Sequence, residues 1–196
     1  VVTALFIFMV SSLLVAGRVA DRFGRRKIFL LGLLLYGAAG IMAGSLPVIW
    51  VLILARSLQG VAIAMLSPSG LAMSLNEFPP SRRAFALGVW GTIGALTGLC
   101  GSPIAAGMIE LFNWQAIFIL TGGFSLLILL AGFVVLSDEQ EGNNQLPIDW
   151  ISAIIAVMAV GGLTLFLVQG QEWGFSSPVT LLCLSLIHIS EPTRPC

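Results

Sequence analysis

Long apolar stretches alternate with short polar segments along nearly the whole chain. Most of these stretches have about the 20 residues that an α-helix needs to cross the hydrocarbon core of a bilayer. The pattern predicts an all-α, polytopic membrane protein, most of which lies in the lipid bilayer. Because Val1 lies directly inside the first stretch, without an initiator Met, we expect a truncated N-terminus. The stretches are residues 1–15, 28–43, 49–75, 84–112, 115–136 and 149–168, and one more begins at Pro178.

The composition supports this class and excludes others. Hydrophobic residues make up 58% of the 196 residues and charged residues 9%, whereas charged residues are about 25% of a typical soluble domain. The net charge is zero, which argues against a nucleic-acid partner. The three cysteines lack metal or redox spacing, and no phosphate-binding loop or nucleophile–base pair is recognisable. We therefore expect no cofactor, no metal and no enzymatic activity.

Basic residues collect in alternate loops. Seven of the nine Lys and Arg residues lie in residues 17–27 and 76–83, and residues 44–48, 110–115 and 169–177 have none. Lys and Arg beside a span mark its cytoplasmic end. The first set of loops, together with the acidic segment 137–149, is therefore predicted to be cytoplasmic.

The densest charged segment runs from Gly17 to Lys27, and we expect it to form a tight turn with Gly17 and Gly24 as its flexible residues. Its spacing, Gly-x-x-x-Asp-Arg-x-Gly-Arg-Arg, resembles the signature loop between helices 2 and 3 of the major facilitator superfamily of secondary transporters. The resemblance implies a loop that gates the cytoplasmic side. The matching residues are Gly17, Asp21, Arg22, Gly24, Arg25 and Arg26.

A single arginine lies well inside a predicted span. Arg56 is about 12 Å below the outer end of the helix that begins near Ile49, and a charge at that depth requires a polar cavity or a partner. The alternative is an arginine whose side chain reaches the headgroups. The segment Arg56 to Gly60 resembles the helix-4 Arg-x-x-Gln-Gly motif of the same superfamily. The resemblance implies that Arg56 takes part in proton coupling and that Gln59, one turn on, shares the site.

The span 84–112 is unusually rich in small residues, which let helix backbones approach closely in lipid. One run within it resembles the Gly-x-x-x-Gly-Pro-x-x-Gly-Gly motif of antiporters, with serine and alanine in place of two glycines. A generic packing face without bearing on transport direction is the alternative. The residues concerned are Gly98, Ser102, Pro103, Ala106 and Gly107.

Weaker resemblances extend the match. Residues 113–118 are similar to the start of helix 6 in drug/proton antiporters, and residues 149–174 are similar to the extra helix pair of the 14-helix branch. On this basis residues 1–136 form most of the N-terminal six-helix bundle without its first helix. Residues 137–148 form a cytoplasmic linker, and residues 149–183 form one further span and the start of the next. Residues 184–196 resemble the translation of a sequencing adapter.

Together the resemblances imply a multi-pass protein of the cell inner membrane, one part of a proton-coupled exporter that works by alternating access. Its implied partners are a small organic substrate, protons and the lipid bilayer, and a membrane-fusion or periplasmic partner is left open. An importer or uniporter of the same fold is one alternative, and a non-transporting sensor or assembly subunit is another. The fragment by itself is not expected to transport.

Overall fold

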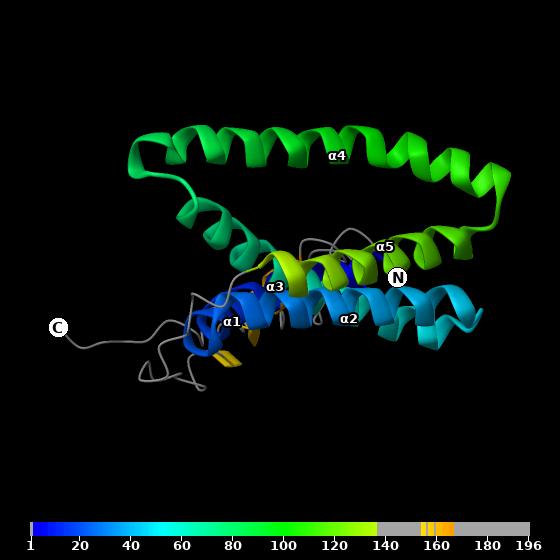
Figure 1. The fold of residues 1–196 in the computed structure, drawn as a ribbon. Helices are drawn as coiled ribbons and strands as arrows, with labels where there is room; N and C mark the ends of the chain where they lie inside the picture. The colour runs from blue at the N-terminus through cyan, green and yellow to red at the C-terminus, as the bar shows by residue number, and fades with distance from the viewer. Residues whose placement is uncertain (1, 137–153, 156, 159, 167–196) are drawn as a thin grey trace.

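The computed structural model describes residues 2–136, 154–155, 157–158 and 160–166. Residues 2–136 form long helices joined by short connections (Figure 1). The predicted spans are confirmed to within a few residues at most ends. The elements are α1 (Val2–Phe23), α2 (Arg25–Ser45), α3 (Ile49–Asn76), the short 3-10 helix η1 (Pro80–Arg82), α4 (Arg83–Leu111) and α5 (Trp114–Val135).

The junction between α1 and α2 is much tighter than the sequence indicated. Of residues 17–27, Gly24 is the one outside a helix, and its φ of 99° lies in the region that glycine adopts without strain. The prediction that Gly17 belongs to the turn is wrong. Gly17 lies in α1, because the apolar stretch continues as helix into the charged segment instead of ending before it. The charged side chains are therefore carried by two helix ends.

Helices α2 and α5 approach each other through glycine. A Cβ atom placed on Gly40 would lie 2.8 Å from the Cα of Gly122, and one on Gly122 would lie 2.9 Å from the carbonyl oxygen of Gly37. Real side chains do not tolerate such distances, so the two backbones are in direct contact. Ser125 adds a buried hydrogen bond from its Oγ to the carbonyl oxygen of Leu33, at 2.9 Å.

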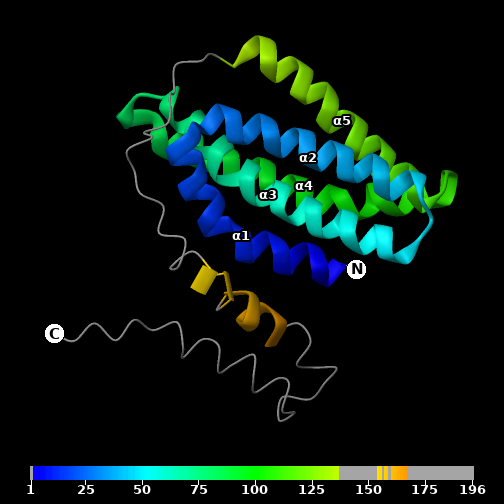
Figure 2. The same cartoon turned by 90° about the horizontal axis from the view of Figure 1, so that it is seen from below.

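Helix α3 packs against α1 on one side and α2 on the other (Figure 2). A Cβ on Gly60 would overlap the carbonyl oxygen of Leu5 in α1. On the side facing α2, a Cβ on Gly32 would lie 3.0 Å from the Leu66 side chain. Close packing at glycine thus joins α1, α2, α3 and α5 into one bundle.

Helix α4 stands apart from that bundle (Figure 1). Within the described chain, Ala86 is its one buried residue. A Cβ added to Gly91, Gly94 or Gly98 would meet no atom of the described residues within 4 Å. Near its start, Trp90 reaches α3, where its ring would lie 3.3 Å from a Cβ on Gly70.

Five helical segments in the described part of the chain are long and apolar enough to cross a membrane. The α1–α2 junction and the start of α4 lie at one end, and the α2–α3 and α4–α5 connections lie at the other (Figures 1 and 2). The basic clusters therefore share one end, as the charge pattern predicted. The residues described between 154 and 166 are helical, inside the predicted span from 149. The linker 137–148 and residues 167–196 lie outside the described residues.

Candidate functional site at Arg56

Arg56 lies on the eighth residue of α3, inside the membrane span. Its guanidinium carbon lies over the ring of Phe118, 4.4 Å from the ring centroid. A cation within about 6 Å of a ring centroid is attracted to the negative face of the ring. Its Nε is buried and has no hydrogen-bond partner among the described residues. The face of the Phe118 ring therefore helps to stabilise this charge, and Tyr36 of α2 adds a favourable electrostatic interaction.

Phe118 is buried, and it packs against small alanine side chains of α2 and α3. The ring of Trp114, one turn earlier in α5, meets it edge-on with 5.9 Å between centroids. The other buried residues of this cluster are Ala39, Ala43 and Ala55, and the half-buried side chains packed against it are Met42, Leu52 and Leu58.

Gln59 is enclosed by protein, whereas a residue that lines a central cavity would be exposed to that cavity. Its side chain is 1% exposed, and its Oε1 accepts no hydrogen bond within the described part. Ser69, farther along α3, is equally enclosed and its Oγ also has no partner there. A buried polar atom without a partner costs about 1–3 kcal/mol. Helix α3 thus carries both an aromatic-held cation and enclosed polar groups.

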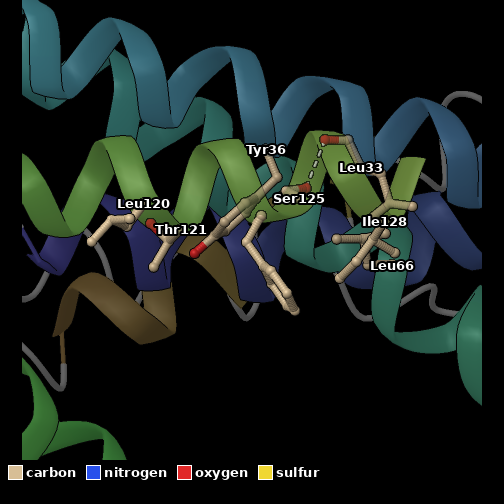
Figure 3. A pocket seen from close by; sticks show the side chains of 8 residues that line it. Leu33, Tyr36, Leu66, Leu120, Thr121, Ser125 and Ile128 are labelled. Atoms are coloured by element: carbon tan, nitrogen blue, oxygen red, sulfur yellow. Dashed lines mark hydrogen bonds between the residues drawn. The ribbon is translucent and has the colours of Figure 1, made fainter. Parts of the chain in front are cut away.

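A hollow of about 550 Å³ lies beside this cluster, between α2, α3 and α5 (Figure 3). The hydroxyls of Thr121 and Ser125 already donate to backbone carbonyl oxygens, so its wall is mostly apolar. Tyr36 points its hydroxyl toward the side where Thr121 lies (Figure 3). The hollow is lined by Leu33, Tyr36, Leu66, Leu120, Thr121, Phe124, Ser125 and Ile128.

The charged residues at the α1–α2 junction interact within the bundle. Arg25 and Asp21 form an ion pair of 3.0 Å across the Gly24 bend. Arg26 donates from Nη2 to the carbonyl oxygen of Phe133, at 3.3 Å. That carbonyl is in the last turn of α5, where backbone acceptors lack helical partners and a positive charge is favourable. Arg22 lies with its guanidinium 5.4 Å from the ring centroid of neighbouring Phe23.

The predicted site residues thus fall into three separate groups. Arg56 and Gln59 lie in the interior of α3, and the junction residues lie at the basic end. The small residues of the antiporter-like run, Gly98 to Gly107, lie on α4. A Cβ added to Gly98 or Gly107 would meet no described atom within 4 Å. The proposed packing role of that run therefore stays a prediction.

Sequence reasoning missed Phe118 as the partner of Arg56. Residues 113–118 resemble the start of a family helix, but nothing in their sequence connects them to Arg56. A buried arginine in a span requires an electron-rich partner, and aromatic residues near the same depth on other spans were available candidates. The glycine contacts between α2 and α5 bring one of them into place, and that arrangement is tertiary.

Comparison with known proteins shows to which family this chain belongs. A model of the Major Facilitator Superfamily matches residues 1–190. The probable multidrug resistance protein EmrY of Escherichia coli (strain K12) is 26% identical over 190 residues, which are 96% of this chain and 37% of that protein. The tetracenomycin C resistance and export protein of Streptomyces glaucescens is 30% identical over 172 residues, 87% of this chain and 32% of the relative.

The puromycin resistance protein pur8 of Streptomyces alboniger is 33% identical over 195 residues, which are 96% of this chain and 38% of that protein. The chain thus spans well under half the length of these relatives. The family match covers nearly all of the chain and agrees with its membrane-spanning helices. This chain is a multi-pass membrane protein that belongs to the major facilitator superfamily of transporters.

Proposed function

We propose that this chain is the amino-terminal part of a proton-coupled exporter of amphipathic organic compounds in the cell inner membrane. Residues 1–136 supply most of the first helical bundle, residues 137–148 the cytoplasmic linker, and residues 149–183 an additional span and the start of the next. The named functions of the relatives support export, since they include resistance to tetracenomycin C and to puromycin.

The placement of Arg56 is the observation that carries this proposal. A cation at the centre of a membrane helix costs about 2.5–3.5 kcal/mol on insertion scales. A charge of that cost is retained where it binds an ion, a proton-bearing group or a substrate. Arg56, with Gln59 one turn on, is the residue that we assign to coupling. Its guanidinium is held by a ring, which leaves N–H groups for an anionic partner.

The charged junction has the properties that a reversible gate needs. Asp21 is 49% exposed and Arg25 32% exposed, and ion pairs at exposed positions contribute about 0–1 kcal/mol. Such contacts can break and reform as two halves of a transporter rock about a central site. In this proposal Asp21, Arg22, Arg25 and Arg26 close the cytoplasmic side, and the helix around Pro103 packs against the remainder of the protein.

The direct test is transport by the complete protein in inside-out membrane vesicles. Puromycin and tetracenomycin C serve as probes, and a protonophore removes the proton gradient. The proposal expects uptake into the vesicles that needs the gradient and is lost in Arg56→Ala. Arg56→Lys, which keeps the charge but not the planar guanidinium, is the matched variant. Uptake that ignores the gradient would favour a uniporter, and no movement of either probe would count against multidrug export.

The junction is tested by Asp21→Asn in the same protein. The change removes one charge while keeping the shape, and the exposed position predicts little loss of stability. We expect export to be abolished and membrane insertion to be unchanged, measured by vesicle uptake and by the amount of protein in washed membranes. Full export by this variant would contradict the gating role.

A further inference from the structure

We propose that Phe118 is a positioning residue for Arg56. In this proposal the face of the Phe118 ring holds the guanidinium at one place in the membrane. Its electron density then sets how readily Arg56 leaves the ring. The inference deepens the proposed function and rests on it where Arg56 is taken as the coupling residue. The holding contact itself is independent of transport.

The geometry is that of a cation over a ring. The Arg56 guanidinium carbon is 4.4 Å from the centroid of Phe118, well inside the range in which the ring quadrupole attracts a cation. Phe118 as a whole is 9% exposed. Desolvation strengthens such a contact, because no water competes for the cation. The rings of Trp114 and Phe118 are perpendicular, with 5.9 Å between their centroids, so Phe118 has a second aromatic contact besides Arg56.

The backbone around Phe118 fixes where that ring lies. A Cβ on Gly40 would come within 3.0 Å of the Phe118 carbonyl oxygen, and a Cβ on Gly44 would lie 2.5 Å from Ile119 Cγ1. Helix α5 is therefore pressed against α2 at this turn. Thr121 also donates to the Phe118 carbonyl oxygen at 3.3 Å. The backbone of α5 at Phe118 therefore cannot shift along α2 without breaking these contacts.

A purely space-filling role does not account for the arrangement. Leucine would also fill a slot bordered by alanines, yet it would leave the guanidinium without an electron-rich surface. The Arg56 Nε has no hydrogen-bond partner among the residues described, and no carboxylate of that part forms an ion pair with Arg56. The Phe118 ring, together with the electrostatic interaction of Arg56 with Tyr36, therefore supplies stabilisation where no counter-ion is described.

The contact also joins two segments that the sequence shows separately. Arg56 belongs to the Arg-x-x-Gln-Gly segment of α3, and Phe118 ends the Asn113–Phe118 segment at the start of α5. Movement of α5 relative to α3 would change the distance between the Phe118 ring and the Arg56 guanidinium, and with it the strength of their attraction. A substrate or proton carrier that draws Arg56 away must overcome the attraction of the ring.

The test alters the charge of the ring face at nearly constant shape. Phe118 is replaced in the complete protein by mono-, di- and trifluorophenylalanine, which progressively weaken the negative face. The readout is the rate at which phenylglyoxal modifies Arg56 in lipid nanodiscs, followed by peptide mass spectrometry. Exposed Arg18 is the internal reference, and the same series at Phe124, 64% exposed on the same helix, is the matched control.

We expect the Arg56 modification rate to rise stepwise with fluorination, to about tenfold for the trifluoro ring, because a desolvated cation–π contact has that strength. The Arg18 rate and the Phe124 series should not change. A flat Phe118 series in folded protein would overturn the inference, and so would an equal rise in the Phe124 series. Neither outcome depends on transport, so failure of probe export would count against the proposed function alone.

Discussion

The α2–α5 seam and helix α4 use the same residue type in opposite circumstances. At the seam, a methyl group on Gly37, Gly40 or Gly122 would collide with a neighbouring backbone or side chain. On α4, a methyl group on Gly94 or Gly98 would meet no described atom within 4 Å. A glycine in a membrane helix thus indicates close helix packing only where another helix lies against it. At the seam it sets the distance between two helices, and on α4 it leaves a smooth face that the described residues do not cover.

The largest effect is expected at the seam. Gly122→Leu places a side chain where the Gly37 carbonyl oxygen and the Ile41 nitrogen already lie 2.9 and 3.0 Å from a Cβ position. Overpacking costs about 1–3 kcal/mol when side chains can adjust, and here backbone must move. We expect a loss of about 3 kcal/mol or more in the free energy of unfolding. Thermal unfolding and size-exclusion elution in detergent measure it.

The neighbouring Gly123 is the matched control for this substitution. Its Cβ position has no described atom within 4 Å, although it lies on the same helix at almost the same depth. Gly123→Leu should therefore leave the unfolding temperature nearly unchanged. If both variants lost the same stability, the loss would come from helix α5 itself and the seam would not be the cause.

The spans were predictable from sequence, whereas this seam was not predicted. Runs of apolar residues of the right length locate helices because lipid requires them. The small residues of α4 were expected to pack closely against the remainder of the protein, and that stays a prediction. The small-xxx-small spacing of Gly40 and Gly44 in α2 was the available signal. Spacing does not say which helix lies opposite, and that is decided by the whole bundle.

The same limit applies to the site. Hydropathy and charge identified Arg56 as unusual because an arginine in a span is costly. Its partner Phe118 lies on another helix, and nothing local in either segment pairs them. The turn at Gly24 was predicted and is confirmed by its positive φ. Gly17 was assigned to that turn because charged residues follow it, yet the end of a membrane helix carries charges readily where it meets the headgroups.

A smaller effect is expected from the hydrogen bond that crosses the seam. Ser125→Ala removes the donor to the Leu33 carbonyl oxygen. Hydrogen bonds between membrane helices contribute about 0.6 kcal/mol on average and up to about 1.7 kcal/mol. Thr97→Val on α4 removes a bond to the Ile93 carbonyl oxygen within the same helix, and should cost less. Denaturant unfolding of both variants measures the two losses in free energy of unfolding. Equal losses would mean that the Ser125 hydrogen bond does not stabilise the contact between α2 and α5.

The basic end offers a weaker contrast between the two regions. Arg26→Gln removes the charge that contacts the Phe133 carbonyl oxygen in the last turn of α5. Because Arg26 itself lies in the first turn of α2, where the dipole disfavours a cation, the net loss should be near the lower end of about 0.3–1 kcal/mol. Arg83→Gln removes one from the first residue of α4, where the helix dipole disfavours a cation, so stability should stay the same or rise slightly. The measurement is unfolding at low salt. A larger loss for Arg83→Gln would show that this arginine has a partner beyond the described residues.

The smallest effect is expected from Gly98→Leu in the 196-residue chain, because nothing described lies within 4 Å of that position. Its free energy of unfolding should change by less than about 0.5 kcal/mol, as for a surface substitution. The same substitution in the complete transporter measures what covers α4. If the remainder of the protein packs on this face, the leucine collides there and the transport rate falls, while Gly98→Ala is tolerated better. Unchanged transport with leucine would mean that the small face of α4 meets lipid, and the proposed packing role of Gly98 to Gly107 would be wrong.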